Sequence, residues 1–323
     1  MDLDELRRQI RSLVTLEDAP EPVLSFFCDL RGGPEAARER SSSRLAALRA
    51  GLPSRERPVF DEASGRVLAL LDAAPDGSRG FAAFSRAGSS PFERSLSFGV
   101  PLPHALSWQA QPSVFPLVEL KDTYHRYVVF HVSADVARVL EVNVGEVTEA
   151  VLRERPESAV PRLSRTNGRK VWQARLRVET TGFLREGIAL VDRIVSGRGH
   201  SHLVLAGPHA VTARVRELLP RHLAVKLFEV IDLGRHEPTA TLLDAALAAF
   251  VEEEERESRR LAEQVALELR RGGLAAAGDD EVRRALAAGR VDVLVLLRGW
   301  GTPAGREGLA RLAEAGGAHV EVV

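Results

Sequence analysis

The chain has 323 residues, of which 45% are hydrophobic and 28% are charged, and its formal net charge is -1. This composition is typical of a soluble globular protein, and no apolar run approaches the roughly 20 residues that span a bilayer, which excludes a membrane segment. The charged N-terminal sequence MDLDELRRQIRSL lacks the apolar core of a signal peptide, so we expect a cytoplasmic protein.

The single cysteine, Cys28, excludes an internal disulfide and a cysteine-based metal cage. It lies in the apolar run VLSFFCDL, where we expect it to be a small buried hydrophobe. The length suits two or three domains, and we predict three, with boundaries at 1–122, 123–233 and 234–323.

The first region alternates helical and strand-like patterns, which predicts a small α/β domain. The region is expected to open with a short helix, followed by the strands 23–30, 80–85 and 93–98 and the helices 35–50 and 61–72. His104, Trp108 and Phe115 follow in a Pro-rich connection. There we expect the aromatic residues to close a domain edge.

The second region begins with short strands between residues 124 and 152, separated by residues that suit turns. A long amphipathic helix ending near Val195 follows, and its buried stripe is expected to pack on one face of the strands. After it come the strand 202–206 and the helix 210–218. The predicted stripe consists of Trp172, Leu176, Thr180, Leu184, Ile188, Val191 and Val195.

A basic stretch, residues 162–177, precedes and enters this helix. It carries six Arg or Lys and no acidic residue. Burial does not explain such a concentration, and cationic side chains at a helix N-terminus oppose the helix dipole, whereas a bound phosphate there is favoured. We interpret it as a basic loop for RNA, with a solvated surface loop as the alternative. The predicted RNA-binding residues are Arg162, Arg165, Asn167, Gly168, Arg169, Lys170, Gln173, Arg175 and Arg177.

Other candidate sites are weak. His200, His202 and His209 cluster in sequence, but no carboxylate is nearby in the sequence, so no metal site is predicted. The turn at Gly207-Pro208 lacks the further glycines and the lysine of a P-loop, and no Gly-x-Ser-x-Gly elbow supports a serine hydrolase. We therefore predict no catalytic residue, no metal and no cofactor.

The third region opens with an unusually long helix, 239–271, that ends at Gly272-Gly273. Its four consecutive glutamates, 252–255, are expected to face outward. The helices 280–288 and 304–315 then alternate with the strands 291–297 and 319–323, an order that implies a parallel strand pair with a crossover. The Trp300 side chain, between two glycines, is expected to pack against its own domain, with a partner anchor as the alternative.

The segments ARLR (174–177), HLVLAGP (202–208) and VKLFEVIDLG (225–234) resemble, in order and spacing, the central domain of the archaeal and eukaryotic peptide-chain release factors and their relative Pelota. The resemblance extends to DDEVRRALAAGRVDVLVLL (279–297), which is similar to the family's third domain, and more weakly to the first region. It implies an α/β, three-domain architecture whose C-terminal domain has a ribosomal-protein-like α/β/α fold.

The family's hydrolytic loop carries a Gly-Gly-Gln motif before the ARLR-like helix. Here Thr166, Asn167 and Gly168 stand at that place, and Gln173 lies five residues too late. The family's Asn-Ile-Lys-Ser codon-reading run is also absent. The resemblance therefore implies a non-hydrolytic, ribosome-binding factor, closer to Pelota or to the bacterial hibernation factor Balon than to a termination factor.

The partners implied are the ribosome, through rRNA or P-site tRNA, and an elongation-factor-type GTPase docked by the C-terminal domain. The implied cellular role is ribosome hibernation, a response to stalled ribosomes or ribosome rescue. Two alternatives stay open: a peptidyl-tRNA hydrolase with a non-standard loop, and a general RNA-binding adaptor.

Overall fold

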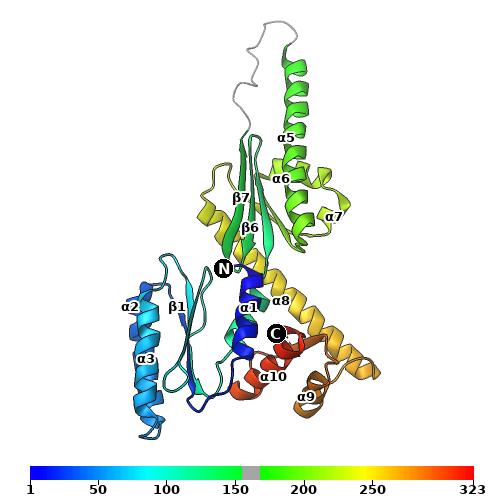
Figure 1. Cartoon of the computed structure of the whole chain (residues 1–323). Helices are drawn as coiled ribbons and strands as arrows, with labels where there is room; N and C mark the ends of the chain where they lie inside the picture. The colour runs from blue at the N-terminus through cyan, green and yellow to red at the C-terminus, as the bar shows by residue number, and fades with distance from the viewer. Residues whose placement is uncertain (155–167) are drawn as a thin grey trace. The chain divides into compact units, whose positions relative to one another are not determined.

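The computed structural model describes the backbone of residues 1–154 and 168–323, and the side chains of these ranges except those of residues 149 and 168–179. The chain divides into two compact units. The first consists of Met1–His125, Val144–Glu146 and Glu254–Val323, and the second of Arg126–Asn143 and Val147–Glu253. Figure 1 shows the elements of both units, and each unit is described by itself. The predicted boundaries of three domains remain a prediction.

The first unit contains a four-stranded antiparallel sheet of order β3-β2-β1-β4. Apolar side chains of the sheet and of two helices form its core, with Phe26, Phe60 and Phe81 at most 1% exposed. The elements are α1 (Leu3–Val14), β1 (Val23–Asp29), α2 (Gly33–Gly51), α3 (Arg57–Asp72), β2 (Gly80–Arg86), β3 (Phe92–Phe98), β4 (Ala105–Gln109) and α4 (Phe115–Thr123). The predicted strands and helices of this region are confirmed to within a few residues.

Two elements of this region were not predicted. The Pro-rich connection contains the strand β4, which pairs with β1, and the helix α4. Trp108 on β4 packs edge-on against Phe60 of α3, with ring centroids 5.2 Å apart, so it belongs to the domain core as predicted. Cys28 is fully buried, and burial raises its pKa to about 12, which confirms a buried, unreactive thiol.

The first unit also contains the C-terminal elements. They are the second part of α8 (Thr239–Arg271), α9 (Asp279–Ala287), β10 (Val293–Leu296), α10 (Pro303–Gly316) and β11 (His319–Val322). The strands β10 and β11 pair in parallel, as the helix–strand–helix–strand order predicted. The predicted end of α8 is confirmed too, because Gly272 has a φ of +65°, a left-handed conformation that suits glycine.

The second unit is built on a five-stranded mixed sheet of order β7-β6-β5-β8-β9. The predicted strand meander supplies three of its strands, β5 to β7. The predicted strand 202–206 is β8, which pairs in parallel with β5, and β9, which the sequence did not predict, pairs in parallel with β8. The elements are β5 (Tyr127–Val132), β6 (Val136–Asn143), β7 (Glu146–Glu154), α5 (Gly168–Arg198), β8 (Leu203–Gly207), α6 (His209–Leu218), α7 (Arg221–Ala224), β9 (Leu227–Asp232) and the first part of α8.

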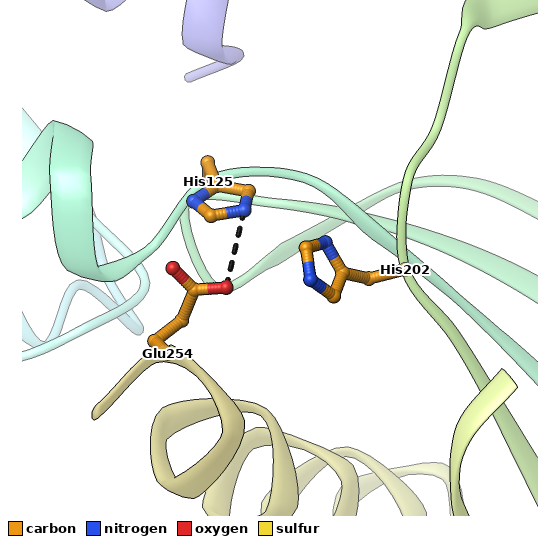
Figure 2. Close-up of side chains that lie close together, drawn as sticks. All are labelled: His125, His202 and Glu254. Carbon is orange, nitrogen blue, oxygen red and sulfur yellow. Dashed lines mark ion pairs between the residues drawn. The ribbon is translucent and has the colours of Figure 1, made fainter. Parts of the chain in front are cut away.

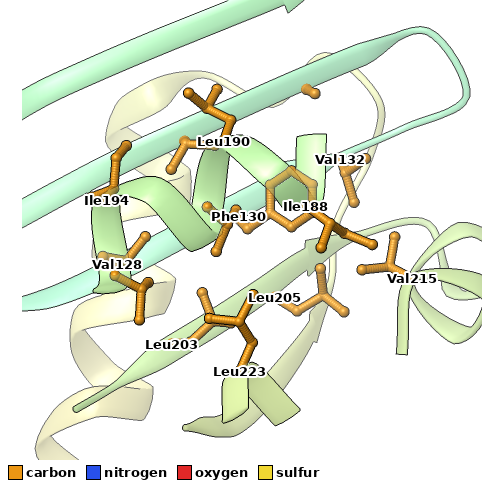
Figure 3. Close-up of a cluster of buried hydrophobic side chains, with 14 of the residues drawn as sticks. Val128, Phe130, Val132, Ile188, Leu190, Ile194, Leu203, Leu205, Val215 and Leu223 are labelled. Carbon is orange, nitrogen blue, oxygen red and sulfur yellow. The ribbon is translucent and has the colours of Figure 1, made fainter. Parts of the chain in front are cut away.

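Helices pack through separate clusters on this sheet. Figure 3 shows the cluster in which α5, α6 and α7 meet β5 and β8. A second cluster joins Leu242, Ala246 and Phe250 of α8 to sheet residues that include Tyr127, whose ring stacks on Phe250 at 4.4 Å. Of the predicted α5 stripe, Leu184, Ile188, Val191 and Val195 are buried, Thr180 is half-buried, and Trp172 and Leu176 lie outside the described side chains.

The glutamate run on α8 does not face outward as a whole. Glu252 and Glu255 are exposed, but Glu253 and Glu254 are 8% and 9% exposed. The physical reason is helical periodicity. Leu242, Ala246 and Phe250 define the buried face at steps of four, and positions 253 and 254 continue that face. A run of like charges therefore contains both exposed and buried members.

A close approach between α5 and the sheet occurs at Gly187. A Cβ atom built there would lie 2.9 Å from Cζ of the buried Phe130 ring. At Gly182, about one and a half turns earlier on the same helix, an added Cβ atom would have no heavy-atom neighbour within 4 Å beyond its chain neighbours and the local helix backbone. Gly187 thus allows the helix to lie close against β5, whereas Gly182 has no such constraint.

We expect Gly187→Ala to lower the stability by about 1–3 kcal/mol, since an added methyl group overpacks the core. Gly182→Ala, the matched control, should raise it by up to about 1 kcal/mol, because alanine favours the helix. Urea unfolding of both variants measures the difference. Equal effects of the two substitutions would contradict the close packing of α5 on β5.

Candidate functional site

The basic stretch lies at the border of β7 and α5, both in the second unit. Arg162, Arg165 and Asn167 lie outside the described residues. Gly168 is the first residue of α5, so Arg169, Lys170, Gln173, Arg175 and Arg177 are helical positions whose side chains are not described. The sequence predicted that the basic stretch enters the helix near Trp172, and the structure begins the helix earlier, at Gly168.

The early start of α5 has a local cause. After Gly168, the residues Arg, Lys, Gln, Ala and Leu all have good helix propensity, and no proline or further glycine interrupts them until Gly182. The helix therefore begins at Gly168, about one turn before Trp172, the first residue of the predicted apolar stripe. Arg169, Gln173 and Arg177 follow each other at steps of four, so their positions share one face of the helix.

The electrostatics of this helix end favour an anion. The first turn of α5 contains no acidic residue, and the unpaired N–H groups and the dipole of a helix N-terminus favour a phosphate. On the neighbouring element, Arg153 of β7 lies 3.9 Å from the carboxylate of Glu186 on α5. Both side chains are more than half exposed, so this pair contributes little to stability.

The histidines of the second unit are placed by the structure in three different environments. His200 is fully buried with its Nε2 2.8 Å from Glu141 of β6, a carboxylate that sequence proximity did not indicate. Burial outweighs this carboxylate and lowers the pKa of His200, so its imidazole is neutral at pH 7. His202 lies edge-on to Phe228 and Phe250, and His209 is exposed. The three side chains do not converge on one another.

A serine, an aspartate and a histidine meet on the surface of the same unit without forming a catalytic relay. Ser196 Oγ donates to Asp192 Oδ1 at 2.6 Å, and His222 Nε2 lies 2.8 Å from the same oxygen. In a hydrolytic triad the histidine contacts the serine hydroxyl, whereas here the aspartate stands between them. This cluster therefore offers no activated nucleophile.

In the first unit, helix α4 is tied to the C-terminal elements by buried carboxylates. Glu307 of α10 accepts hydrogen bonds from the backbone N–H groups of Val114 and Phe115, at 2.8 and 3.0 Å, and from Ser113 Oγ at 2.8 Å. It therefore caps the N-terminus of α4. Near the other end of α4, Lys121 pairs with Glu314 of α10, and both side chains are less than 9% exposed.

Titratable side chains gather beyond this pair. Asp122, His319 and Glu321 approach one another, and burial together with the charge of Glu321 raises the pKa of Asp122 to about 7. Beside them, His125 lies 3.3 Å from Glu254, as Figure 2 shows; His202, also drawn there, belongs to the second unit. Sequence analysis missed this group because its members are separated by up to about 200 residues, and no local pattern signals their meeting.

The comparison with protein families matches a part of the chain that lies mostly in the second unit. Residues 112–251 match the family model described as "Bacterial archaeo-eukaryotic release factor family 10". Over these residues the chain is similar to the bacterial branch of the release-factor superfamily. This match contains β5 to β9 and α5, and hence the basic stretch, so the predicted resemblance is confirmed. None of the curated proteins matches the chain.

Solved structures also resemble the chain at low identity. An archaeal translation termination factor, aRF1, is 17% identical, with coverage of 100% of this chain and 92% of its own and a TM-score of 0.33. Pelota of Archaeoglobus fulgidus is 13% identical, with coverages of 99% and 85% and a TM-score of 0.38. Dom34 of S. cerevisiae is 12% identical, with coverages of 75% and 74% and a TM-score of 0.38.

Because their TM-scores are below 0.5, these solved structures do not inform the interpretation of the site. The similarity to the release-factor superfamily rests on the sequence match over residues 112–251. The predicted α/β fold class is confirmed on the described elements themselves, since each of the three predicted regions contains its own sheet. None of the helices in the described part of the chain combines the length and apolar composition that crossing a membrane requires.

Proposed function

We propose that the protein is a ribosome-associated translation factor, a release-factor homologue that acts without hydrolytic chemistry. It binds the ribosomal A site with the basic stretch, residues 162–177, directed at the peptidyl-transferase centre or at nearby rRNA. The observation that carries the proposal is the family match over residues 112–251, because it contains this stretch at the place of the family's hydrolytic loop.

Three features of the chain support the absence of hydrolysis. Thr166, Asn167 and Gly168 replace Gly-Gly-Gln, so a glycine without a side chain stands where the motif has its water-positioning glutamine. Gln173 is the nearest glutamine, and it lies on the second turn of α5. Among the described residues of the second unit, the Ser196, Asp192 and His222 cluster lacks the order of contacts that a hydrolase needs.

The cellular role that we propose is ribosome hibernation, a response to stalled ribosomes or ribosome rescue, in the cytoplasm. One similar solved structure is a model of ribosome-bound archaeal Pelota and ABCE1, and another is S. cerevisiae Dom34, which interacts with Hbs1. By analogy, an elongation-factor-type GTPase is the partner that we propose for the C-terminal domain. No cofactor is part of the proposal.

The decisive experiment is co-sedimentation of the purified full chain with ribosomes from growing and from starved cells, followed by imaging of the complex. Density for the chain in the A site supports the proposal. Salt-dependent binding to bare RNA without binding to 70S ribosomes would instead identify a general RNA-binding adaptor.

A release assay separates this proposal from a peptidyl-tRNA hydrolase. We expect no stop-codon-dependent release of labelled peptide from P-site tRNA, because the loop has neither the paired glycines nor the glutamine of the hydrolytic motif. A standard release factor in the same reaction is the positive control. Release by the purified chain at a rate well above background would replace the proposed function with an enzymatic one.

A further inference from the structure

A cluster outside the RNA-facing stretch has the composition of a metal site. Asp122 lies near the end of α4 and is 6% exposed, while His319 and Glu321 are on β11. These two are separated by one residue, so they lie on the same side of the strand. Each of the three residues offers one ligand atom, and these atoms all lie within 4.8 Å of one another. We propose that Asp122, His319 and Glu321 form a binding site for a divalent transition-metal ion, with Zn²⁺ as the type case.

The distances within the cluster fit an ion better than they fit hydrogen bonds. His319 Nε2 is 3.8 Å from Asp122 Oδ1 and 3.5 Å from Glu321 Oε2. Hydrogen bonds between such groups are about 2.7–3.2 Å long. Ligands bound tetrahedrally to Zn²⁺ at about 2.0–2.1 Å are about 3.4 Å apart. An ion placed among the three atoms would thus require only small movements of the side chains.

The remaining carboxylate oxygens are held by the protein. Asp122 Oδ2 accepts the backbone N–H of Val322 at 2.8 Å, and Glu321 Oε1 accepts the hydroxyl of Ser258. These bonds fix the two carboxylates so that Oδ1 and Oε2 face the imidazole. Such outer contacts orient the ligands of metal sites in proteins.

The charges and donor types select the class of ion. As metal ligands, the carboxylates of Asp122 and Glu321 would supply two negative charges that a divalent cation balances, and the ammonium of Lys121 is already paired with Glu314. A nitrogen donor among oxygens favours Zn²⁺ or a similar transition metal over Mg²⁺ and Ca²⁺, which prefer oxygen alone. The His319 side chain is 53% exposed, which provides a route from solvent and room for water as a fourth ligand.

A bound ion would connect the last turn of α4 to the C-terminal strand β11 within the first unit. The C-terminal elements would therefore be more stable with metal than without it, since a ligand that binds only the folded state stabilises that state. This role is structural, and it does not depend on the proposed ribosomal function.

The test uses the full chain without an affinity tag, treated with EDTA and dialysed, and then titrated with Co²⁺ and with Zn²⁺. We expect one equivalent of Co²⁺ to bind, with the visible absorption of a low-coordinate site, and Zn²⁺ to displace it. At about a hundredfold excess over Kd, Zn²⁺ should raise the Tm by roughly 5 °C or more. No saturable binding, or binding without a shift in Tm, would overturn the proposal.

Substitutions locate the site. His319→Ala should weaken Co²⁺ binding at least about tenfold and abolish the visible absorption. Since His319 is half exposed, this variant is expected to fold, and circular dichroism checks it. Glu321→Gln provides a second, isosteric test. The matched control is His222→Ala, because His222 is also 53% exposed and lies beside a carboxylate, Asp192. Equal loss in both histidine variants, or no loss in His319→Ala, would refute the assignment.

Discussion

Replacing Arg165, Arg169 and Lys170 with glutamate is expected to weaken ribosome binding by on the order of a hundredfold or more at physiological salt. Binding to a phosphate backbone releases condensed counterions, and each lost phosphate contact removes somewhat under one unit from the slope of log affinity against log salt. The triple variant should therefore show both a lower affinity and a slope reduced by about 2–3 units. Sedimentation at several salt concentrations measures both quantities.

The fold should survive these substitutions. The three positions precede the described buried part of α5, which begins at Leu184, and exposed charge changes usually alter stability by no more than about 0.5 kcal/mol. An unchanged Tm is therefore part of the expected result. Arg175 and Arg177 lie further along the helix and are less suitable probes.

A matched control is available on α6 and α7 of the same unit. Arg214, Arg216 and Arg221 are exposed, and their replacement by glutamate lowers the formal net charge by the same amount as in the first variant. If both triple variants lose binding equally, the effect is one of general charge and the basic stretch has no special role. Loss in the first variant alone identifies residues 165–170 as facing the ribosome.

Hydrophobic periodicity predicted the long elements well. The helix α8 runs from Thr239 to Arg271 as predicted, because its apolar positions recur at helical steps and glycines end it. The parallel pairing of β10 with β11 followed from the order of elements alone. These features depend on local sequence, so a single chain contains enough information to predict them.

The helix α4 could not be predicted in this way, because the group that caps it is far away in the sequence. Its N-cap residue, Val114, provides no side-chain hydrogen bond, and Pro116 lies in its first turn. The carboxylate of Glu307, nearly 200 residues later, accepts the N–H groups that a local serine or aspartate would otherwise bind. The side-chain cap of α4 is thus present in the structure, but it comes from a distant residue and has no counterpart in the local sequence.

The same limit applies to sites. The family resemblance gave the proposed RNA-binding stretch a definite position in the sequence, because the residues of that stretch are contiguous. It gave no indication of Asp122, His319 and Glu321, which converge only after α4 and β11 have packed. Glu253 and Glu254 could have been predicted to be buried, because the helical periodicity of α8 places them on its apolar face. The four consecutive charges led instead to the prediction that the whole run is exposed.

Breaking the buried ion pair between Lys121 and Glu314 is expected to destabilise the first unit strongly. Lys121→Met leaves the Glu314 carboxylate buried without its cation, and removal of one member of such a pair costs about 3–5 kcal/mol. Urea unfolding of the full chain, monitored by circular dichroism, measures the loss. The control is Arg7→Met, which breaks the exposed pair of Arg7 with Asp4 and should have no measurable effect.

The double variant Lys121→Met with Glu314→Leu distinguishes the cost of an unpaired charge from the value of the pair itself. Since two apolar side chains of similar volume avoid the desolvation of two ions, this variant should recover most of the stability lost in Lys121→Met. It leaves the cap from Glu307 and the contact of Asp122 with Val322 in place, so α4 keeps its other links to the C-terminal elements. A double variant as unstable as Lys121→Met would mean that the ion pair itself, and not the relief of a buried charge, stabilises the packing of α4 on α10.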